Sequence, residues 1–256
     1  MSERGGRGGL GGVVVVTGAG GDIGRAAALL LSERGAHVVA VDLDPGAAER
    51  TAQAIGEAGG QGTAIAADVT DFAQVEAYAA AAADLGGGTI AGFVNNAGVE
   101  GRIAPLGAMT VADFDAVMAV NVRGVFLGLS AVLPLMAEGG SVVNTASSGG
   151  LRGSPGMAAY VASKHAVIGL TKVAALEVAD RAIRVNAVCP SGVEGRMISS
   201  LEQQRALRGS AGTSTERMGR KATPRDVAQA IGYLVGSESA FVSGTTLSVD
   251  GTRTAG

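Results

Sequence analysis

A tyrosine and a lysine spaced four residues apart could carry out acid–base chemistry. Tyr160 and Lys164 occur in YVASK, inside an alanine-rich stretch that is predicted to be helical, so both side chains lie on one helix face. A phenol with an ordinary pKa near ~10 is a poor base at neutral pH, but a neighbouring ammonium, or a positively charged ring bound beside it, lowers that pKa. We therefore expect Tyr160 to exchange a proton with a substrate oxygen. On spacing alone, an ordinary amphipathic Tyr/Lys pair explains the pattern equally well.

The glycine-rich stretch TGAGGDIG could bind phosphate. It follows four valines and precedes a helical pattern, and the free amides at the start of a helix favour anions. We expect Gly18 to permit the tight turn and Gly24 to let the helix pack closely on the sheet. Gly20 and Gly21 are expected to let backbone amides approach a pyrophosphate. Asp22 adds a negative charge, and we expect its side chain to cap this helix at the cost of some like-charge repulsion.

An acidic residue at the end of the second predicted strand indicates which dinucleotide would bind. Asp42 ends the stretch HVVAVD, 18 residues after Gly24, where a carboxylate can accept hydrogen bonds from both hydroxyls of an adenosine ribose. The same carboxylate would repel the 2′-phosphate of NADP, and Leu43 beside it supplies no compensating cation. The sequence therefore favours NAD(H), with a plain turn acid as the alternative role for Asp42.

The composition argues against several classes of function. The chain of 256 residues is 47% hydrophobic, with a formal net charge of −3 and aromatics at 3%, which disfavours nucleic-acid binding. The single cysteine, Cys189, excludes an internal disulfide and fits a reducing cytoplasm. No secretory signal pattern is present, and the uncharged apolar stretch 124–137 is too short to span a bilayer. We expect a soluble cytoplasmic protein with no nucleic-acid, membrane or metal partner, since His37 and His165 lack ligand spacing.

Short β-branched runs alternate with alanine- and leucine-rich helical patterns. Strands are predicted near Val13–Thr17, His37–Asp42, Thr63–Ala66, Ile90–Asn95, Ser141–Thr145, Arg184–Cys189 and Thr246–Val249. Helices are predicted near 23–34, 46–58, 71–84, 110–137, 157–180 and 224–236. Repeated strand–helix–strand units indicate an α/β fold: a doubly wound, Rossmann-like parallel sheet of about seven strands with helices on both faces. Ligands of such sheets bind at the carboxyl ends of the strands.

No composition shift divides the chain, so we predict a flexible tail over 1–12 and a single dinucleotide-binding and catalytic domain over 13–256. The poorly hydrophobic stretch Glu202–Lys221 is predicted to be a mobile flap. Capping signals mark three helix starts: Thr110 with Asp113, Thr223 with Asp226 and, more weakly, Asp71 with Gln74.

From about residue 10 to the end, the order and spacing of short motifs resemble the short-chain dehydrogenase/reductase family. The motifs are TGAGGDIG, AADV, NNAG, NVRG, NTASS, YVASK, NAVCPSG and SVDG. Two positions depart from the family's pattern. Asp22 stands where TGxxxGxG has its second glycine, and the segment Pro190–Gly195 lacks the threonine of PGxxxT. Ser191 and Ser199 are the candidates to replace that hydroxyl.

The resemblance implies roles for further polar residues. Ser147, 13 residues before Tyr160, would hold the substrate oxygen. Asn121 would support a water relay to Lys164, which would also hold the nicotinamide ribose. From the residues alone, Ser148 is the alternative to Ser147, and a simple packing hydrogen bond is the alternative role for Asn121.

The resemblance also implies which other residues contact the ligands, many of them through the backbone. Besides the glycines named above, Asp22 and Asp42, the cofactor set is Ile23, Leu43, Asp68, Val69, Asn95, Ala97, Gly98, Tyr160, Lys164, Pro190, Gly192 and Val193. The substrate set is Val99, Ser147, Gly149, Leu151, Met157 and Tyr160.

These inferences predict an NAD-dependent oxidoreductase that interconverts a secondary alcohol and a ketone, with Tyr160 as general acid and base. Two alternatives remain: an NADPH-using biosynthetic carbonyl reductase of the 3-oxoacyl type, and a non-catalytic dinucleotide sensor or scaffold. The resemblance further implies a homotetramer, with the helices over 110–137 and 157–180 as one contact surface.

Overall fold

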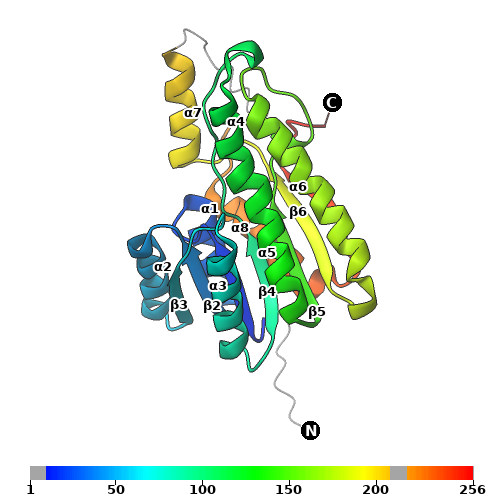
Figure 1. Cartoon of the computed structure of the whole chain (residues 1–256). Helices are drawn as coiled ribbons and strands as arrows, with labels where there is room; N and C mark the ends of the chain where they lie inside the picture. Colours follow the sequence, from blue (N-terminus) through cyan, green and yellow to red (C-terminus); the bar gives the residue numbers. More distant parts are fainter. Residues whose placement is uncertain (1–9, 208–217, 256) are drawn as a thin grey trace.

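The computed structural model describes residues 10–207 and 218–255. Within that part of the chain, seven parallel strands form one sheet in the order β3-β2-β1-β4-β5-β6-β7 (Figure 1). The strands are β1 (Val13–Thr17), β2 (His37–Asp42), β3 (Gln61–Ala66), β4 (Ile90–Asn95), β5 (Met136–Thr145), β6 (Arg184–Pro190) and β7 (Thr246–Val249). The predicted doubly wound, Rossmann-like sheet is confirmed.

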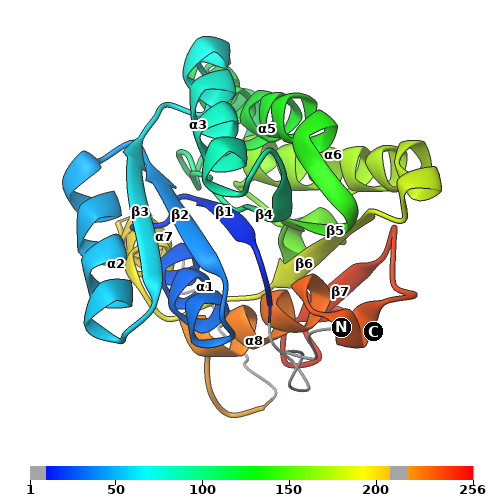
Figure 2. The ribbon, with the colours of Figure 1, turned by 90° about the horizontal axis from the view of Figure 1, so that it is seen from below.

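Helices cover both faces of this sheet. Figure 2 shows α3, α5 and α6 on one face and α1 and α8 on the other. The helices are α1 (Asp22–Glu33), α2 (Pro45–Glu57), α3 (Phe72–Leu85), α4 (Val111–Met118), α5 (Gly124–Val132), α6 (Ala158–Glu177), α7 (Arg196–Ala206) and α8 (Pro224–Val235).

The valines of β1 show how the sequence produces this layering. Val13 and Val15 pack in a core cluster with side chains of α3, α5 and α6, whereas Val14 and Val16 pack with α1 and α8. Successive strand residues point to opposite faces, so an uninterrupted apolar run gives a strand that is buried on both sides. β1 therefore occupies the centre of the sheet between two helix layers.

Side-chain caps start three helices where the sequence predicts them. Thr110 and Asp113 form a reciprocal capping box at α4, and Thr223 and Asp226 form another at α8. Asp71 caps α3 by accepting hydrogen bonds from two backbone amides of its first turn. These local contacts fix the helix starts independently of the rest of the fold.

The predicted helix over 110–137 is irregular and too long. A π-helical turn, Ala119–Arg123, joins α4 to α5, and the run ends in a 3-10 turn, Leu133–Leu135. Pro134 lies in that turn and has no amide with which to continue a helix. β5 therefore begins at Met136, earlier than predicted.

The helical run Val111–Leu135 is long and apolar enough, by length and composition alone, to cross a membrane. The sequence-based expectation was wrong on this point because it counted only the uncharged stretch 124–137. In this structure 44% of the run's apolar window is buried within the protein, where α5 lies between α3 and α6 (Figure 2). Packing in a helix layer explains that composition without a bilayer.

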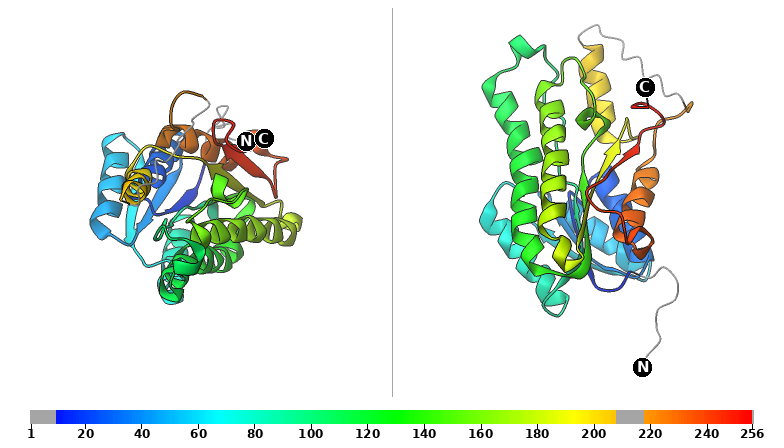
Figure 3. Two further views of the ribbon diagram at one scale, coloured as in Figure 1. Left: turned by 90° about the horizontal axis from the view of Figure 1, so that it is seen from above. Right: turned by 90° about the vertical axis from the view of Figure 1, so that its right-hand side faces the viewer.

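α7 is a helix that the sequence analysis missed. It covers part of the segment 202–221 that was predicted to be a mobile flap, and Leu201 is its one buried residue within the described range. Figure 3 shows α7, in yellow, beyond the carboxyl-terminal edge of the sheet. Its polar composition hid it, although the three-residue spacing of Ile198 and Leu201 is a helical signal.

Two predicted flexible segments fall partly outside the described residues. Residues 1–9 of the predicted tail and residues 208–217 of the predicted flap are not described. Where the description begins, the amide of Leu10 already donates to the carbonyl of Arg34, at the end of α1.

The strand order places the ligand crevice. From β1 the chain proceeds outward to β2 and β3, and then returns to place β4 on the other side of β1. In doubly wound sheets, ligands bind at the carboxyl ends of the strands beside such a reversal. The loops after β1, β4, β5 and β6 meet there.

Candidate active site

A cavity of about 370 Å³ opens at the carboxyl ends of the strands, within the ~300–1,000 Å³ typical of small-molecule sites. Most of the predicted site residues line it, but Gly20, Asn95, Asn121 and Leu151 do not. Those that do are Gly18, Gly21, Asp22, Ile23, Gly24, Asp42, Leu43, Asp68, Val69, Ala97, Gly98, Val99, Ser147, Gly149, Met157, Tyr160, Lys164, Pro190, Gly192 and Val193.

The glycine loop after β1 is held by its own hydrogen bonds. The Gly20 amide donates to Asp42 Oδ2 (2.8 Å), and the Gly21 amide donates to the Gly18 carbonyl (3.1 Å). Gly18 has a φ of 63°, in the left-handed region that favours glycine. A Cβ on Gly24 would stand 2.1 Å from the Gly18 carbonyl oxygen. The loop thus requires glycine at both positions; at Gly24 the reason is the approach of the Gly18 carbonyl rather than the expected packing of the helix on the sheet.

Three amides at the start of α1 remain available to an anion. Within the described residues, the N–H groups of Asp22, Ile23 and Gly24 meet no acceptor. They stand at the positive end of the α1 dipole, and their residues line the cavity. This arrangement fits the pyrophosphate of a dinucleotide.

The Asp22 side chain does not cap its own helix. α1 begins after Gly21 with no side-chain cap. Instead, Asp22 Oδ2 accepts a hydrogen bond of 2.8 Å from the Arg196 amide at the start of α7. The expected local cap is therefore wrong, because a partner that is distant in the sequence takes the carboxylate.

Asp42 ends β2 with its carboxylate in the cavity wall. Its Oδ2 accepts from the Gly20 amide, and its Oδ1 accepts from the Asp44 amide at 3.0 Å. The neighbouring Leu43 is 71% exposed, and the wall residues that follow β3 include Asp68 but no cation among those described. The electrostatic environment at this end of the cavity is therefore acidic.

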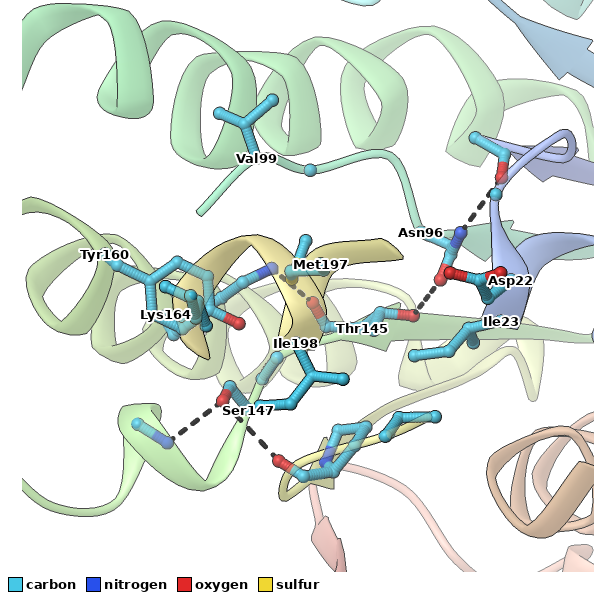
Figure 4. Close-up of a pocket in the computed structure, with 18 of the residues that line it drawn as sticks. Asp22, Ile23, Asn96, Val99, Thr145, Ser147, Tyr160, Lys164, Met197 and Ile198 are labelled. Atoms are coloured by element: carbon cyan, nitrogen blue, oxygen red, sulfur yellow. Dashed lines mark hydrogen bonds between the residues drawn. The ribbon is translucent and has the colours of Figure 1, made fainter. Parts of the chain in front are cut away.

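Ser147 and Tyr160 bring two hydroxyl groups together in the cavity. Ser147 lies just beyond β5, and its Oγ accepts from the Gly149 amide at 3.0 Å (Figure 4). Its hydroxyl donates to the Pro190 carbonyl at 3.5 Å. The Tyr160 ring, from the first turn of α6, is a neighbour, because a Cβ on Gly149 would lie 3.5 Å from both Ser147 Oγ and Tyr160 Cε1. Ser148 also lines the cavity, but the Ser147 hydroxyl borders the same Gly149 position as the Tyr160 ring, which favours Ser147 as the residue that acts with Tyr160.

Lys164 is a buried cation one helical turn beyond Tyr160. Only 4% of its surface is exposed, and its Nζ donates to the Thr145 carbonyl at 2.8 Å. The ammonium lies over the Tyr160 ring, 5.8 Å from the ring centroid. Burial lowers the pKa of Lys164 to about 8, because the apolar surroundings disfavour the charged form.

In the protein alone, burial raises the pKa of Tyr160, opposite to the expected direction. The nearby Ser147 hydroxyl lowers this pKa, while the Glu100 carboxylate raises it further. Lys164 does not offset the burial, because its ammonium stands over the ring and is itself desolvated. A further positive charge close to the phenol would lower this pKa.

Two predicted asparagines lie behind the cavity wall. Asn121, in the π-helical turn, accepts from the Val99 amide (2.8 Å) and donates to the Val99 carbonyl (2.9 Å) and to Ser163 Oγ (3.0 Å). The two N–H donors of the Asn121 side-chain amide are therefore both used, and its bonds to Val99 hold the backbone of a residue that lines the cavity. The water relay to Lys164 stays a prediction. Asn95 turns away to donate to a carbonyl of α5, and Asn96 lines the wall instead.

Gly20 and Leu151, the other two predicted site residues that do not line the cavity, are also kept from it by their geometry. Gly20 acts from behind the wall by holding Asp42, and a Cβ at Gly20 would come within 2.3 Å of the Ala47 side chain. Leu151 lies in a turn after the 3-10 helix Ser148–Gly150 and is 39% exposed.

α7 and the loop before it supply wall residues that sequence reasoning missed. Of the two serines considered as replacements for the absent threonine, Ser191 lines the cavity, but Ser199 bonds back to the carbonyl of Gly195 (2.9 Å). Additional lining residues not predicted individually include Asn96, Arg152, Arg196, Met197, Ile198, Leu201, Arg205 and Arg253.

Comparison with known proteins assigns the chain to a family. A family model described as enoyl-(acyl carrier protein) reductase matches residues 18–253. Levodione reductase from Leifsonia aquatica is 37% identical over 252 residues, which are 95% of this chain and 94% of that protein. The chain belongs to the short-chain dehydrogenase/reductase family. Cyclohexanol dehydrogenase from Acinetobacter sp. (strain SE19) is 35% identical and covers 94% of both chains.

Solved structures of this family share the whole fold. The crystal structure of levodione reductase superposes with a TM-score of 0.90 at 37% identity, covering 95% of this chain and 97% of that one. The structure of NAD⁺-bound xylitol dehydrogenase gives a TM-score of 0.85 at 33% identity, covering 93% and 97%. The catalytic serine, tyrosine and lysine expected from the family's pattern fall at one cavity in this chain.

The two departures from the family's pattern meet in space. Asp22 occupies the second glycine position of TGxxxGxG, and Gly195 occupies the threonine position of PGxxxT. The Asp22 carboxylate fills the space beside Gly195, where a Cβ would lie 2.2 Å from Asp22 Oδ2. A threonine at position 195, as in the family's pattern, would leave no room for the Asp22 carboxylate where this chain places it.

Proposed function

We propose that this member of the short-chain dehydrogenase/reductase family is an NAD-dependent oxidoreductase that interconverts a secondary alcohol and a ketone. Its cofactor is a nicotinamide dinucleotide, and the catalytic residues are Ser147, Tyr160 and Lys164. One observation carries this proposal most directly: the hydroxyls of Ser147 and Tyr160 and the buried Lys164 share a cavity with the unsatisfied amides that start α1.

Each residue of this group has a distinct role. A bound nicotinamide would supply the hydride-transfer chemistry between the alcohol and the ketone, and its oxidised form would add positive charge to the cavity. The Ser147 hydroxyl donates to the substrate oxygen and steadies the negative charge that develops there. Tyr160 takes the alcohol proton during oxidation and gives it back during reduction. Lys164 keeps a cation beside the phenol and holds the nicotinamide ribose.

The reaction is tested with purified protein, NAD and a panel of secondary alcohols. We expect NADH absorbance to increase with at least one alcohol, and to decrease when NADH is offered with the corresponding ketone. A protein that binds NADH in a fluorescence titration but turns over no compound in either direction would support the sensor or scaffold alternative. In that case the catalytic proposal would be wrong.

The preference for NAD over NADP rests on Asp42. We expect wild-type protein to bind NADH more tightly than NADPH, since the Asp42 carboxylate lies in the cavity wall and the described wall residues that follow β2 and β3 include Asp68 but no cation. The double substitution Asp42→Ala and Leu43→Arg removes the repulsion of the 2′-phosphate by Asp42. We expect it to shift the ratio of the two dissociation constants toward NADPH by about tenfold or more, since ~1.4 kcal/mol changes a dissociation constant tenfold. Fluorescence titrations with both cofactors measure this ratio.

The matched control for that substitution is Asp44→Ala. Asp44 also carries a carboxylate just after β2, but it caps α2 through the Gly46 amide and does not line the cavity. Its loss should leave the cofactor ratio unchanged. Tighter binding of NADPH by the wild type would instead favour the biosynthetic carbonyl reductase.

We also propose a homotetramer in the cytoplasm, with α4, α5 and α6 forming one contact surface. Their outer faces leave large apolar side chains uncovered: Phe126 is 52% exposed and Leu176 is 81% exposed. Exposed apolar groups gathered on adjacent helices are typical of subunit interfaces. The buried thiol of Cys189 is compatible with a reducing compartment.

Phe126→Asp should break this assembly. A charge at the centre of an apolar interface is left without a partner, so we expect multi-angle light scattering to give a smaller mass than the tetramer of the wild type. Phe72→Asp is the control, because Phe72 is 41% exposed at the start of α3 and an acid is tolerated in a first helical turn. A Phe126→Asp protein that remains tetrameric would place the interface elsewhere.

A further inference from the structure

We propose that Asp22 and Gly195 form a matched pair that anchors helix α7 to the dinucleotide-binding loop. In this role Asp22 positions the substrate side of the cavity while its charge weakens the binding of the cofactor. The inference rests on the proposed function, since it assigns opposite effects on the cofactor and the substrate to one side chain.

The first support is the contact itself. Asp22 Oδ2 accepts the backbone amide of Arg196, the first residue of α7, at 2.8 Å. The residue that precedes α7 is Gly195, which has no side chain to cap the helix. Asp22 therefore supplies from another part of the chain the acceptor that an N-cap residue normally provides.

The second support is that Gly195 makes room for this acceptor. Its φ of 137° lies in a region that favours glycine. A Cβ at this position would stand 2.2 Å from Asp22 Oδ2 and 2.4 Å from Asp22 Cγ, so a side chain at 195 and the carboxylate exclude each other. The absence of the threonine and the presence of the aspartate are thus one structural change.

The anchored helix forms the substrate side of the cavity. Met197, Ile198 and Leu201 of α7 line it, and Leu201 packs with Met157 in a separate apolar cluster. Figure 4 shows Met197 between Tyr160 and Asp22, with Ile198 below it, close to Ser147. A shift at the start of α7 would move these side chains relative to the catalytic hydroxyls, with a cost in substrate binding.

The charge of Asp22 acts in the opposite direction on the cofactor. Asp22 is the first residue of α1, whose unsatisfied amides fit a pyrophosphate. The carboxylate gains from the positive ends of both α1 and α7, but it is a like charge to any phosphate bound at α1. Because Asp22 is solvent-exposed, we expect this repulsion to be modest and to weaken as salt is added.

Two substitutions separate the anchor from the charge. Asp22→Asn keeps an oxygen that can accept from the Arg196 amide but removes the charge. Asp22→Gly removes both and restores the residue of the family's pattern. We expect both variants to bind NADH about twofold to fivefold more tightly at low ionic strength, as expected for removal of an exposed like charge at a helix terminus.

The substrate should respond differently to the two variants. The KM for the alcohol should stay near the wild-type value in Asp22→Asn and rise about threefold to tenfold in Asp22→Gly, the range for a lost helix cap. Hydrogen exchange gives a readout that does not need turnover. The Arg196 amide should exchange slowly in the wild type and in Asp22→Asn, and faster in Asp22→Gly.

A double-mutant cycle tests the pairing. Gly195→Ala alone should destabilise the start of α7, because its Cβ collides with the carboxylate. Combining it with Asp22→Gly removes that collision, so the double variant should show less additional exchange at Arg196 than the sum of the two single variants. Additive effects would show that the two positions are independent and would overturn the pair.

Other outcomes also decide the proposal. An unchanged Arg196 exchange rate in Asp22→Gly would show that the carboxylate does not anchor α7. Weaker binding of NADH together with a higher KM for the alcohol in both Asp22 variants would indicate general damage to the loop. That result would also overturn the proposal. If the wild type binds neither NADH nor NADPH, the proposed function fails, whereas the exchange measurements still test the anchor.

Discussion

Tyr160→Phe should reduce alcohol oxidation and ketone reduction by about 10²–10⁴-fold, the contribution typical of a positioned general acid or base. The substitution removes one hydroxyl and keeps the ring that packs beside Lys164. We therefore expect the dissociation constant for NADH and the unfolding temperature to change little, so that the loss is in kcat. Steady-state rates in both directions, together with a fluorescence titration, measure these quantities.

The pH dependence of the wild-type rates tests proton transfer by Tyr160 independently. Burial raises the pKa of Tyr160, so the phenol is mainly protonated at neutral pH in the protein alone. Oxidation needs the phenolate and should accelerate as pH rises, whereas reduction needs the phenol and should slow at high pH. Positive charge from the oxidised nicotinamide lowers the pKa when it is bound, and should move the oxidation profile to lower pH.

Tyr233→Phe is the matched control for the Tyr160 substitution. Tyr233 lies on α8, is 40% exposed and does not line the cavity. Its loss should leave both rates unchanged. Retention of activity by Tyr160→Phe, beside an unaffected Tyr233→Phe, would show that another group transfers the proton.

The fold could be predicted because its signals are local. The strand VVVV must be buried on both faces, and Thr223 with Asp226 fixes the start of α8 without reference to other segments. α7 has no capping residue of its own in the sequence, because the contact that caps it comes from Asp22, and it has only one buried residue in the described range. The end of the helix over 110–137 could have been placed by giving Pro134 more weight.

The site could be predicted in its membership but less well in its electrostatics. The spacing of Tyr160 and Lys164 placed both side chains in one cavity. That spacing says nothing about burial, which raises the pKa of one group and lowers that of the other. The partner of Asp22 could not be predicted either. A helix cap is normally sought among residues close in the sequence, whereas the Arg196 amide comes near Asp22 only in the complete fold.

Lys164→Met should make the folded protein more stable at pH 7 while it removes activity. Burial lowers the pKa of Lys164 from 10.5 to about 8, so the folded state carries a desolvated ammonium below that pH. This difference corresponds to roughly 3 kcal/mol of lost stability. Methionine removes that cost but also forfeits the hydrogen bond to the Thr145 carbonyl, which is worth about 1 kcal/mol. We expect a net gain of about 1–3 kcal/mol in the free energy of unfolding.

The stabilisation should depend on pH in a defined direction. As pH rises from about 8 toward 10.5, Lys164 loses its proton in the folded state while the unfolded chain keeps it. Wild-type stability therefore increases over this interval relative to Lys164→Met, and the difference between the two proteins narrows. Chemical denaturation at several pH values measures it, and Lys172→Met, an exposed lysine on α6, should show no such trend.

A destabilised Lys164→Met protein at pH 7 would contradict this interpretation, since it would mean that the lysine supports the fold. If the expected gain is observed, the cavity retains a buried cation at the expense of stability. A residue of that kind is maintained by what it does in the cavity, because an apolar side chain of similar length would serve the fold better. The opposite signs of the stability and activity changes would therefore connect Lys164 to the chemistry rather than to the packing of α6.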